Sequence, residues 1–302
     1  MIRKLNKAIG GIGLLAVSHS AARSRSLRGL IAGCLIVLGS LTAPLRAWAE
    51  ELNVAVAANF LGTLKKLAPM YEQASGNHLV PSAGSSGQLY TQIKQGAPFD
   101  VLLSADRDRP AYLEAEGLAV PGSRFTYAIG TLVLWSPLSG VVDGAGKVLS
   151  GNRYHMLAIA NPATAPYGEA AQQVLTTLGL WDTLNSSKKI VVGESIDQAW
   201  QFTATGAADL GFVALSEVTH EGVISGSYWI PPQSMYKSID QNAVLLTRSS
   251  KRLAAGNFLS WLQHDGHAIA TIKAAGYHVP GPTIGLHPVP GHAQLGRESP
   301  PA

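Results

Sequence analysis

The stretch LNVAVAANFLGTLKKLAPMYEQASG, residues 52–76, decides the fold class. Its first seven residues are almost all apolar, which is typical of a strand buried on both faces. Asn59 then stands in the position of a helix N-cap, and Gly76 ends the helix. Between them, apolar side chains recur at helical spacing, at Phe60, Leu64, Leu67 and Tyr71. The stretch therefore predicts a buried strand followed by an amphipathic helix.

The same alternation of strand and helix continues along the chain. Further strands are predicted over 78–82, 99–104, 157–160, 189–192 and 210–214, and helices over 88–95, 110–116, 167–178 and 196–205. Such alternation predicts an α/β fold with mainly parallel sheets.

Two further apolar strands, predicted over 128–135 and 243–247, flank the second set of strand–helix units. They suggest that the chain crosses to a second α/β lobe and later returns, so that a two-segment hinge joins the lobes. We predict lobe 1 over 50–129 and 241–279, and lobe 2 over 130–240. Residues 280–302 are rich in proline and have little apolar periodicity, so they are predicted to be a disordered tail.

Residues 1–49 are predicted to be a signal peptide. They contain seven basic residues and no acidic one, followed by an apolar run and the small-residue pattern Ala47-Trp48-Ala49. Cys34 lies inside the apolar run, which favours a removed segment over a lipoprotein anchor. Cleavage after Ala49 leaves 16 basic residues against 19 acidic ones. The exported chain is then free of cysteine and mildly acidic. Its acidic charge balance argues against a nucleic-acid partner.

The candidate binding residues lie at the junctions where a predicted strand ends and a predicted helix begins. Small or polar residues occupy four such junctions, at 58–59, 84–87, 165–168 and 194–196. In parallel α/β sheets these junctions share the carboxyl edge of the strands, where ligands bind. Free backbone N–H groups and the helix dipole make each helix start an anion site. If two lobes face each other, the four junctions converge on one cleft suited to a compact oxyanion.

The chain from about Leu52 to Tyr277 resembles the periplasmic molybdate-binding proteins, the solute-binding subunits of molybdate ABC importers. The motifs that carry the resemblance occur in order, at 55–60, 83–89, 96–106, 161–168, 178–182 and 208–213. The resemblance implies a type II periplasmic binding protein fold, with a ligand cleft between two α/β lobes. It also implies a periplasmic location, molybdate or tungstate as the ligand, an ABC permease as the partner, a monomer, and neither enzymatic activity nor a cofactor.

The resemblance also implies the ligand donors. Ser86 is expected to donate its hydroxyl and its backbone N–H. Tyr167 and Ile196 are expected to donate backbone N–H groups alone, as oxyanion contacts and not as direct ligands of the metal. Asn59, with Ala58, is expected to supply a backbone N–H, and its side-chain amide is a second candidate donor.

Other interpretations of these residues stay open. Asn59 alone is equally a helix cap, and a serine-glycine segment is often a simple turn. The anion could be sulfate or another tetrahedral oxyanion, or Ser86 could be the nucleophile of an exported hydrolase, although Gln88 stands where a nucleophile elbow needs glycine. Asp100 is expected to be a structural acceptor, and Glu194 and Asp197 are expected to point away from the site or cap the helix.

Overall fold

The structure, a computed structural model, describes residues 49–281, except 152 and 221. The predicted signal peptide with Cys34, and the predicted tail, lie outside the described residues apart from residues 49, 280 and 281. Within the described part of the chain, none of the helices combines the length and the apolar character needed to cross a membrane.

The first sheet has five strands. Its order is β2 (His78–Gly84), β1 (Glu51–Ala57), β3 (Val101–Leu103), β12 (Ile239–Leu245) and β4 (Phe125–Gly130). Strand β1 pairs in parallel with β2 and β3, whereas β12 runs antiparallel to β3 and β4. We call this sheet and its helices lobe 1.

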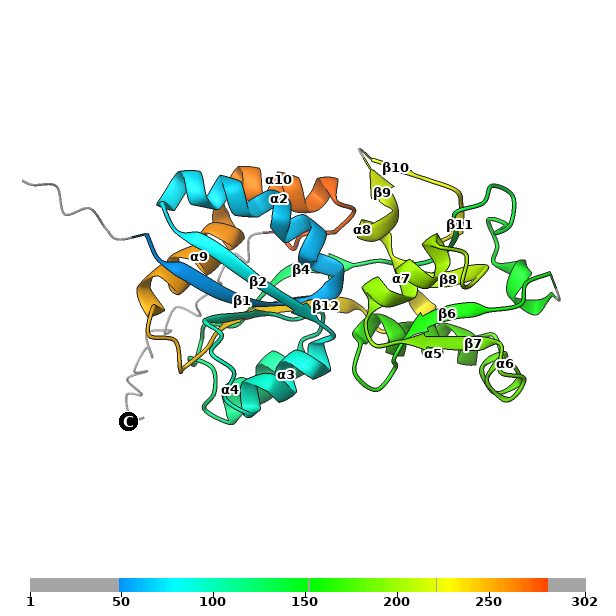
Figure 1. The fold of residues 1–302 in the computed structure, drawn as a ribbon, viewed down its shortest axis with the longest axis horizontal. Helices are drawn as coiled ribbons and strands as arrows, with labels where there is room; N and C mark the ends of the chain where they lie inside the picture. The colour runs from blue at the N-terminus through cyan, green and yellow to red at the C-terminus, as the bar shows by residue number, and fades with distance from the viewer. Residues whose placement is uncertain (1–48, 152, 221, 282–302) are drawn as a thin grey trace, which may run out of the picture. The chain divides into compact units, whose positions relative to one another are not determined.

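Helices cover both faces of the lobe 1 sheet (Figure 1). On one face lie α2 (Ala58–Ser75), α9 (Arg252–His264) and α10 (Gly266–Ala274), and on the other lie α3 (Ser86–Lys94) and α4 (Asp108–Ala115). The β1 side chains alternate accordingly, since Val54 and Val56 pack with α2 and α9 while Ala55 packs with α3. Burial on both faces explains why residues 54–57 of β1 are all apolar.

The second sheet also has five strands, and with its helices it forms lobe 2. Its order is β11 (Ser227–Trp229), β5 (Leu132–Ser136), β8 (Leu210–Ala214), β6 (Leu157–Ala160) and β7 (Ile190–Gly193). Strand β6 is parallel to β7 and β8, and β5 is antiparallel to β8 and β11. The other elements are α5 (Pro166–Thr177), α6 (Trp181–Ser186), α7 (Ile196–Ala204), α8 (Leu215–Val218), β9 (Thr219–His220), β10 (Val223–Ile224) and the 3₁₀ turns η1 (Lys147–Ser150) and η2 (Gln233–Met235).

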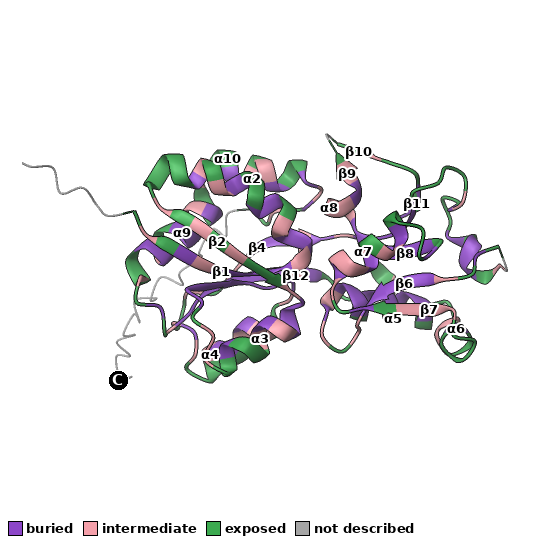
Figure 2. Cartoon of the chain, in the orientation of Figure 1, coloured by how far each residue is buried: buried purple, intermediate pink, exposed green. Residues whose placement is uncertain are grey.

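Each lobe has its own buried core. Strands at the centre of both sheets are buried, while the outer surfaces of the helices are exposed (Figure 2). Two α/β lobes, each with its own buried core, confirm the predicted two-lobe fold of the type II class.

The single strand predicted over 128–135 is wrong. The chain there forms two strands in different sheets, because β4 ends at Gly130 in lobe 1 and β5 begins at Leu132 in lobe 2. A continuous apolar run is compatible with either arrangement, since a run of apolar residues does not show where one strand ends and the next begins. The second passage between the sheets leads from β11 to β12, which begins at Ile239 and pairs Ile239 with Gly130.

Candidate functional site

A small cavity lies where four helices begin. The structure brings all five predicted site residues to it. Its lining residues are Ala57, Ala58, Asn59, Gly84, Ser85, Ser86, Ala105, Ala165, Pro166, Tyr167 and Ile196. We call it the interlobe cavity, because α2 and α3 belong to lobe 1 and α5 and α7 to lobe 2. Each of these helices follows the carboxyl end of a parallel strand, as predicted for a ligand site in an α/β sheet.

Ser86 is the first residue of α3 and is almost fully buried. Its Oγ accepts a hydrogen bond from the backbone N–H of Ala105 at 2.9 Å. A hydroxyl that accepts this bond still has its own proton to donate. The next two N–H groups are already used, that of Gly87 by the carbonyl of Thr164 and that of Gln88 by Ser85 Oγ. Ser86 can therefore offer its hydroxyl proton and its backbone N–H to the cavity.

Tyr167 and Ile196 offer backbone N–H groups, because each stands in the first turn of a helix, where N–H groups have no partner within the helix. Helix α5 begins with Pro166, which has no N–H, so Tyr167 carries its first N–H group. Ser195 caps α7 by accepting from the N–H of Gln198, which leaves the Ile196 N–H uncapped by that side chain.

Asn59 is not a helix N-cap, because α2 begins one residue earlier and Ala57 holds the N-cap position without a side-chain bond. The Asn59 side chain is buried, and its Nδ2 donates to Gln241 Oε1 at 2.9 Å and to the Tyr277 hydroxyl at 3.0 Å. These two bonds occupy both amide hydrogens. The candidate side-chain donor is therefore engaged inside the protein, and Asn59 can offer only its backbone N–H, like its neighbour Ala58.

The electrostatics of the cavity favour a small anion. Among the described residues that line it, none carries a charged side chain. Each helix start is equivalent to roughly +0.5 of a charge, so four of them give about two positive charges. The cavity volume is about 10 Å³, whereas sites for organic ligands typically measure about 300–1,000 Å³. The cavity therefore suits a compact dianion held by neutral donors.

The carboxylates near the site are engaged elsewhere. Asp100 accepts from the backbone N–H of Asn53 at 2.8 Å and from the Ser249 hydroxyl at 2.7 Å, so it is the structural acceptor that the sequence predicts. Glu194 accepts from Gln88 Nε2, and Asp197 accepts from a glutamine one turn further along α7. Neither Glu194 nor Asp197 lines the cavity, which agrees with the prediction that they point away.

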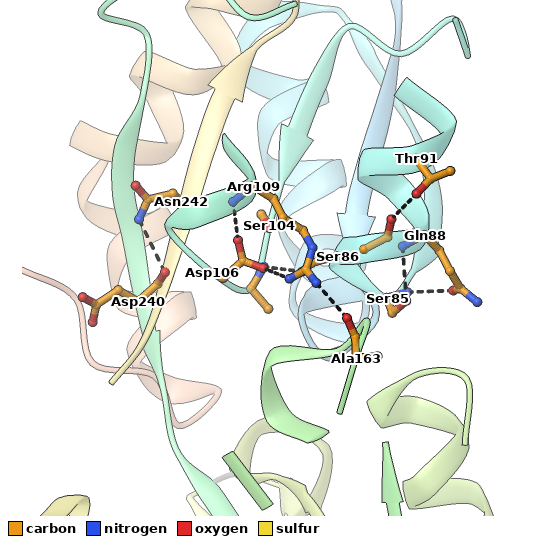
Figure 3. Close-up of polar contacts among 12 residues, drawn as sticks. Ser85, Ser86, Gln88, Thr91, Ser104, Asp106, Arg109, Ala163, Asp240 and Asn242 are labelled. Atoms are coloured by element: carbon orange, nitrogen blue, oxygen red, sulfur yellow. Dashed lines mark hydrogen bonds and ion pairs between the residues drawn. The ribbon is translucent and has the colours of Figure 1, made fainter. Parts of the chain in front are cut away.

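Hydrogen bonds between the two lobes surround the cavity. The N–H of Gly87 donates to the Thr164 carbonyl at 2.9 Å, and Gln88 Nε2 donates to Glu194 Oε2 at 3.0 Å. Arg109, held by the carboxylate of Asp106, reaches the Ala163 carbonyl (Figure 3). The lobes are therefore in contact around the site, as expected for a closed arrangement.

Sequence reasoning missed the buried polar groups behind the site. Gln241 and Tyr277, which bind the Asn59 side chain, are 0% and 4% exposed. Ser216 of lobe 2 donates to the Asn59 carbonyl, and the Tyr277 hydroxyl lies 2.8 Å from Ser216 Oγ. For Gln241 a signal was available, because consecutive polar residues at 240–242 interrupt an otherwise apolar strand.

Two α/β lobes that close on a small cavity lined by helix starts define the class of solute-binding receptors. The chain belongs to the family of bacterial extracellular solute-binding proteins, whose model matches residues 52–278.

Relatives within this family confirm the resemblance seen in the sequence. The chain is 48% identical over 244 residues to the molybdate-binding protein ModA of Azotobacter vinelandii, an alignment that covers 80% of this chain and 96% of the relative. It is 46% identical to ModA of Rhodobacter capsulatus, with 84% of this chain and 97% of that relative covered. The solved structure of the periplasmic molybdate-binding protein of Azotobacter vinelandii superimposes with a TM-score of 0.75 at 50% identity, covering 76% of this chain and all of that one. As a member of this family the chain is a binding protein and not an enzyme, as predicted.

Proposed function

We propose that the chain is the periplasmic receptor of a molybdate ABC importer and that it binds molybdate or tungstate in the interlobe cavity. The observation that carries this proposal is the cavity itself, in which four helix starts and one serine hydroxyl face a space without charged side chains. Relatives at 46–48% identity bear the name of molybdate-binding proteins.

We propose Ala58, Asn59, Ser86, Tyr167 and Ile196 as the donors. All five act through backbone N–H groups, and Ser86 adds its hydroxyl as a sixth donor. Hydrogen bonds to a charged group contribute about 1.5–3 kcal/mol each, so six such bonds suffice for tight binding even after the costs of association. The oxyanion is a transported ligand and not a cofactor.

The proposal includes the cleavage site of the signal peptide and the bounds of the two lobes. Cleavage after Ala49 releases a monomeric receptor with lobe 1 over 50–129 and 241–279 and lobe 2 over 130–240. The membership of β4 and β12 in one sheet, and of β5 and β11 in the other, supports this division, except that Gly130 and residues 239–240 belong to strands of the lobe 1 sheet.

The alternatives are not favoured. A serine hydrolase needs a base beside its nucleophile. Among the described residues lining the cavity there is no histidine, lysine or carboxylate, and the recorded hydrogen bond to Ser86 Oγ comes from a backbone N–H. A receptor for sulfate has no specific observation in its support.

The test is calorimetric titration of residues 50–302 with molybdate, tungstate, sulfate and phosphate. We expect tight one-to-one binding of molybdate and tungstate, and far weaker binding of the other two anions. Tight binding of sulfate or phosphate alone would overturn the proposal.

A further inference from the structure

The two passages of chain between the lobes meet beside the interlobe cavity. The first leaves lobe 1 at Gly130, the last residue of β4, and the second enters it at Ile239, the first residue of β12. These two residues are partners in the sheet, and the pairing of β12 with β4 shifts register just after Gln241. Both connections between the lobes therefore run next to Gly130 and Gln241.

The side chain of Tyr167 reaches this meeting point from lobe 2. Tyr167 is 1% exposed, and its hydroxyl accepts a hydrogen bond from Gln241 Nε2 at 3.3 Å. A Cβ atom added to Gly130 would lie 2.0 Å from the Tyr167 hydroxyl oxygen and 2.8 Å from Gln241 Nε2. The hydroxyl thus occupies the space that any other residue at position 130 would fill. The backbone N–H of Tyr167 belongs to the first turn of α5, at the cavity.

Gln241 joins this contact to the other side of the site. Its Oε1 accepts from Asn59 Nδ2 at 2.9 Å and from the Tyr127 hydroxyl at 3.1 Å, while its Nε2 donates to the Tyr167 hydroxyl. One amide therefore connects a proposed donor residue of lobe 1 with one of lobe 2. Asn59, Gln241, Tyr127 and Tyr167 are all at least nine-tenths buried, so none of these groups finds water as a substitute partner while the lobes are closed.

We propose that Gly130 and Gln241 are positioning residues that form a seat for the Tyr167 hydroxyl and thereby couple lobe closure to anion binding. The seat is filled when the lobes close, and the filled seat fixes the start of α5, with its N–H toward the cavity. Neither Gly130 nor Gln241 lines the cavity, so both act through Tyr167 and Asn59. This inference rests on the proposed function, because it concerns the same site.

The first test is Gly130→Ala, which adds one methyl group where the hydroxyl sits. We expect the affinity for molybdate to fall about tenfold or more, with faster release, since overpacking a closed contact is costly. The ligand-free protein should keep its thermal midpoint, because the seat is empty when the lobes are open. Gly256→Ala in α9 is the matched control, since no atom lies within 4 Å of its added Cβ, and it should bind as the parent does.

The second test is the double variant Gly130→Ala/Tyr167→Phe. Removing the hydroxyl takes away the atom nearest to the new methyl group, so part of the lost affinity should return, although the ring carbon Cζ at 2.9 Å keeps the recovery incomplete. By itself, Tyr167→Phe should weaken binding, because the Gln241 amide loses its acceptor.

The outcomes separate this inference from the proposed function. All variants are compared with the parent on whichever oxyanion the parent binds most tightly, by calorimetry and by stopped-flow measurement of release. A parent that binds none of the four anions would overturn the proposed function and the seat with it. A parent that binds, together with a Gly130→Ala variant of equal affinity, would overturn the seat alone. The seat would also be overturned if Gly130→Ala lowered the ligand-free thermal midpoint without weakening binding, since that is a purely structural effect.

Discussion

Replacing Ser86 by alanine removes two hydrogen bonds at once. The loss of one should lower the affinity for the anion, and the loss of the other should lower the free energy of unfolding. The hydroxyl proton is the proposed bond to the anion, and its loss costs about 1.5–3 kcal/mol of binding, or roughly 10- to 150-fold in Kd. The oxygen is the acceptor for the Ala105 N–H at 2.9 Å. Because Ala105 is 2% exposed, its N–H would be left without a partner, which costs about 1–3 kcal/mol of the free energy of unfolding.

The assay combines calorimetric titration with molybdate and urea unfolding of the ligand-free protein. Ser249→Ala is the control, because Ser249 is also a buried serine whose hydroxyl donates at 2.7 Å, but to Asp100 and away from the cavity. We expect both variants to lose stability and only Ser86→Ala to lose affinity. Equal affinities in the parent and Ser86→Ala would refute the assignment of the hydroxyl as a ligand donor.

Three further predictions each concern one residue. Gln88→Leu should speed release of the anion several-fold in stopped-flow fluorescence, because it deletes the 3.0 Å bond from α3 to Glu194 across the lobes, worth about 1 kcal/mol. It also deletes the bond that Gln88 Oε1 accepts from the Ser85 N–H, which should lower the stability of α3. Glu194→Gln keeps an acceptor for Gln88 and should resemble the parent. Burial raises the pKa of Glu217 from 4.5 to about 8, so the folded protein keeps a proton that the unfolded chain has lost. The free energy of unfolding should therefore be highest below the lower value and fall as the pH rises toward the upper one, and urea unfolding of Glu217→Gln should show a flatter dependence. The backbone N–H groups of Met156 and His155 lower the pKa of Asp209. Because Asp209 is exposed and solvent weakens these bonds, Asp209→Ala should lose about 1 kcal/mol or less of the free energy of unfolding at neutral pH, with a smaller difference in acid and unchanged affinity.

The order of strands and helices was predictable because it follows from local patterns. Residues 52–58 are apolar apart from Asn53, and glycine ends the following helix, so strand and helix could be predicted from residues 52–76. The convergence of four junctions was also predictable, because parallel strands place them at one edge of each sheet. The assignment of Ser86 as a ligand donor depends on the resemblance to the molybdate-binding family, because a serine at a helix start is by itself equally a turn or cap residue.

Other features depended on contacts that local patterns do not contain. Nothing in an apolar run shows that the chain changes sheets between Gly130 and Leu132, because the run continues through the last residues of β4 and into β5. The side chain of Asn59 has its partners more than 180 residues away, at Gln241 and Tyr277, so its orientation depends on the tertiary fold. Helix capping is a local preference, and here the buried amide network outweighs it.

The proposed shell of backbone donors has a consequence for how such a receptor can change. A substitution at Ala58 or Ile196 alters a side chain but leaves the N–H group in place, so most single mutations cannot delete these donors. Ser86 is the exception among the five residues. Selectivity between anions of different size can then be engineered only indirectly, through residues behind the helices that shift where each helix begins. Libraries aimed at a new oxyanion should therefore vary the packing under α2, α5 and α7 and leave the residues at the cavity surface unchanged.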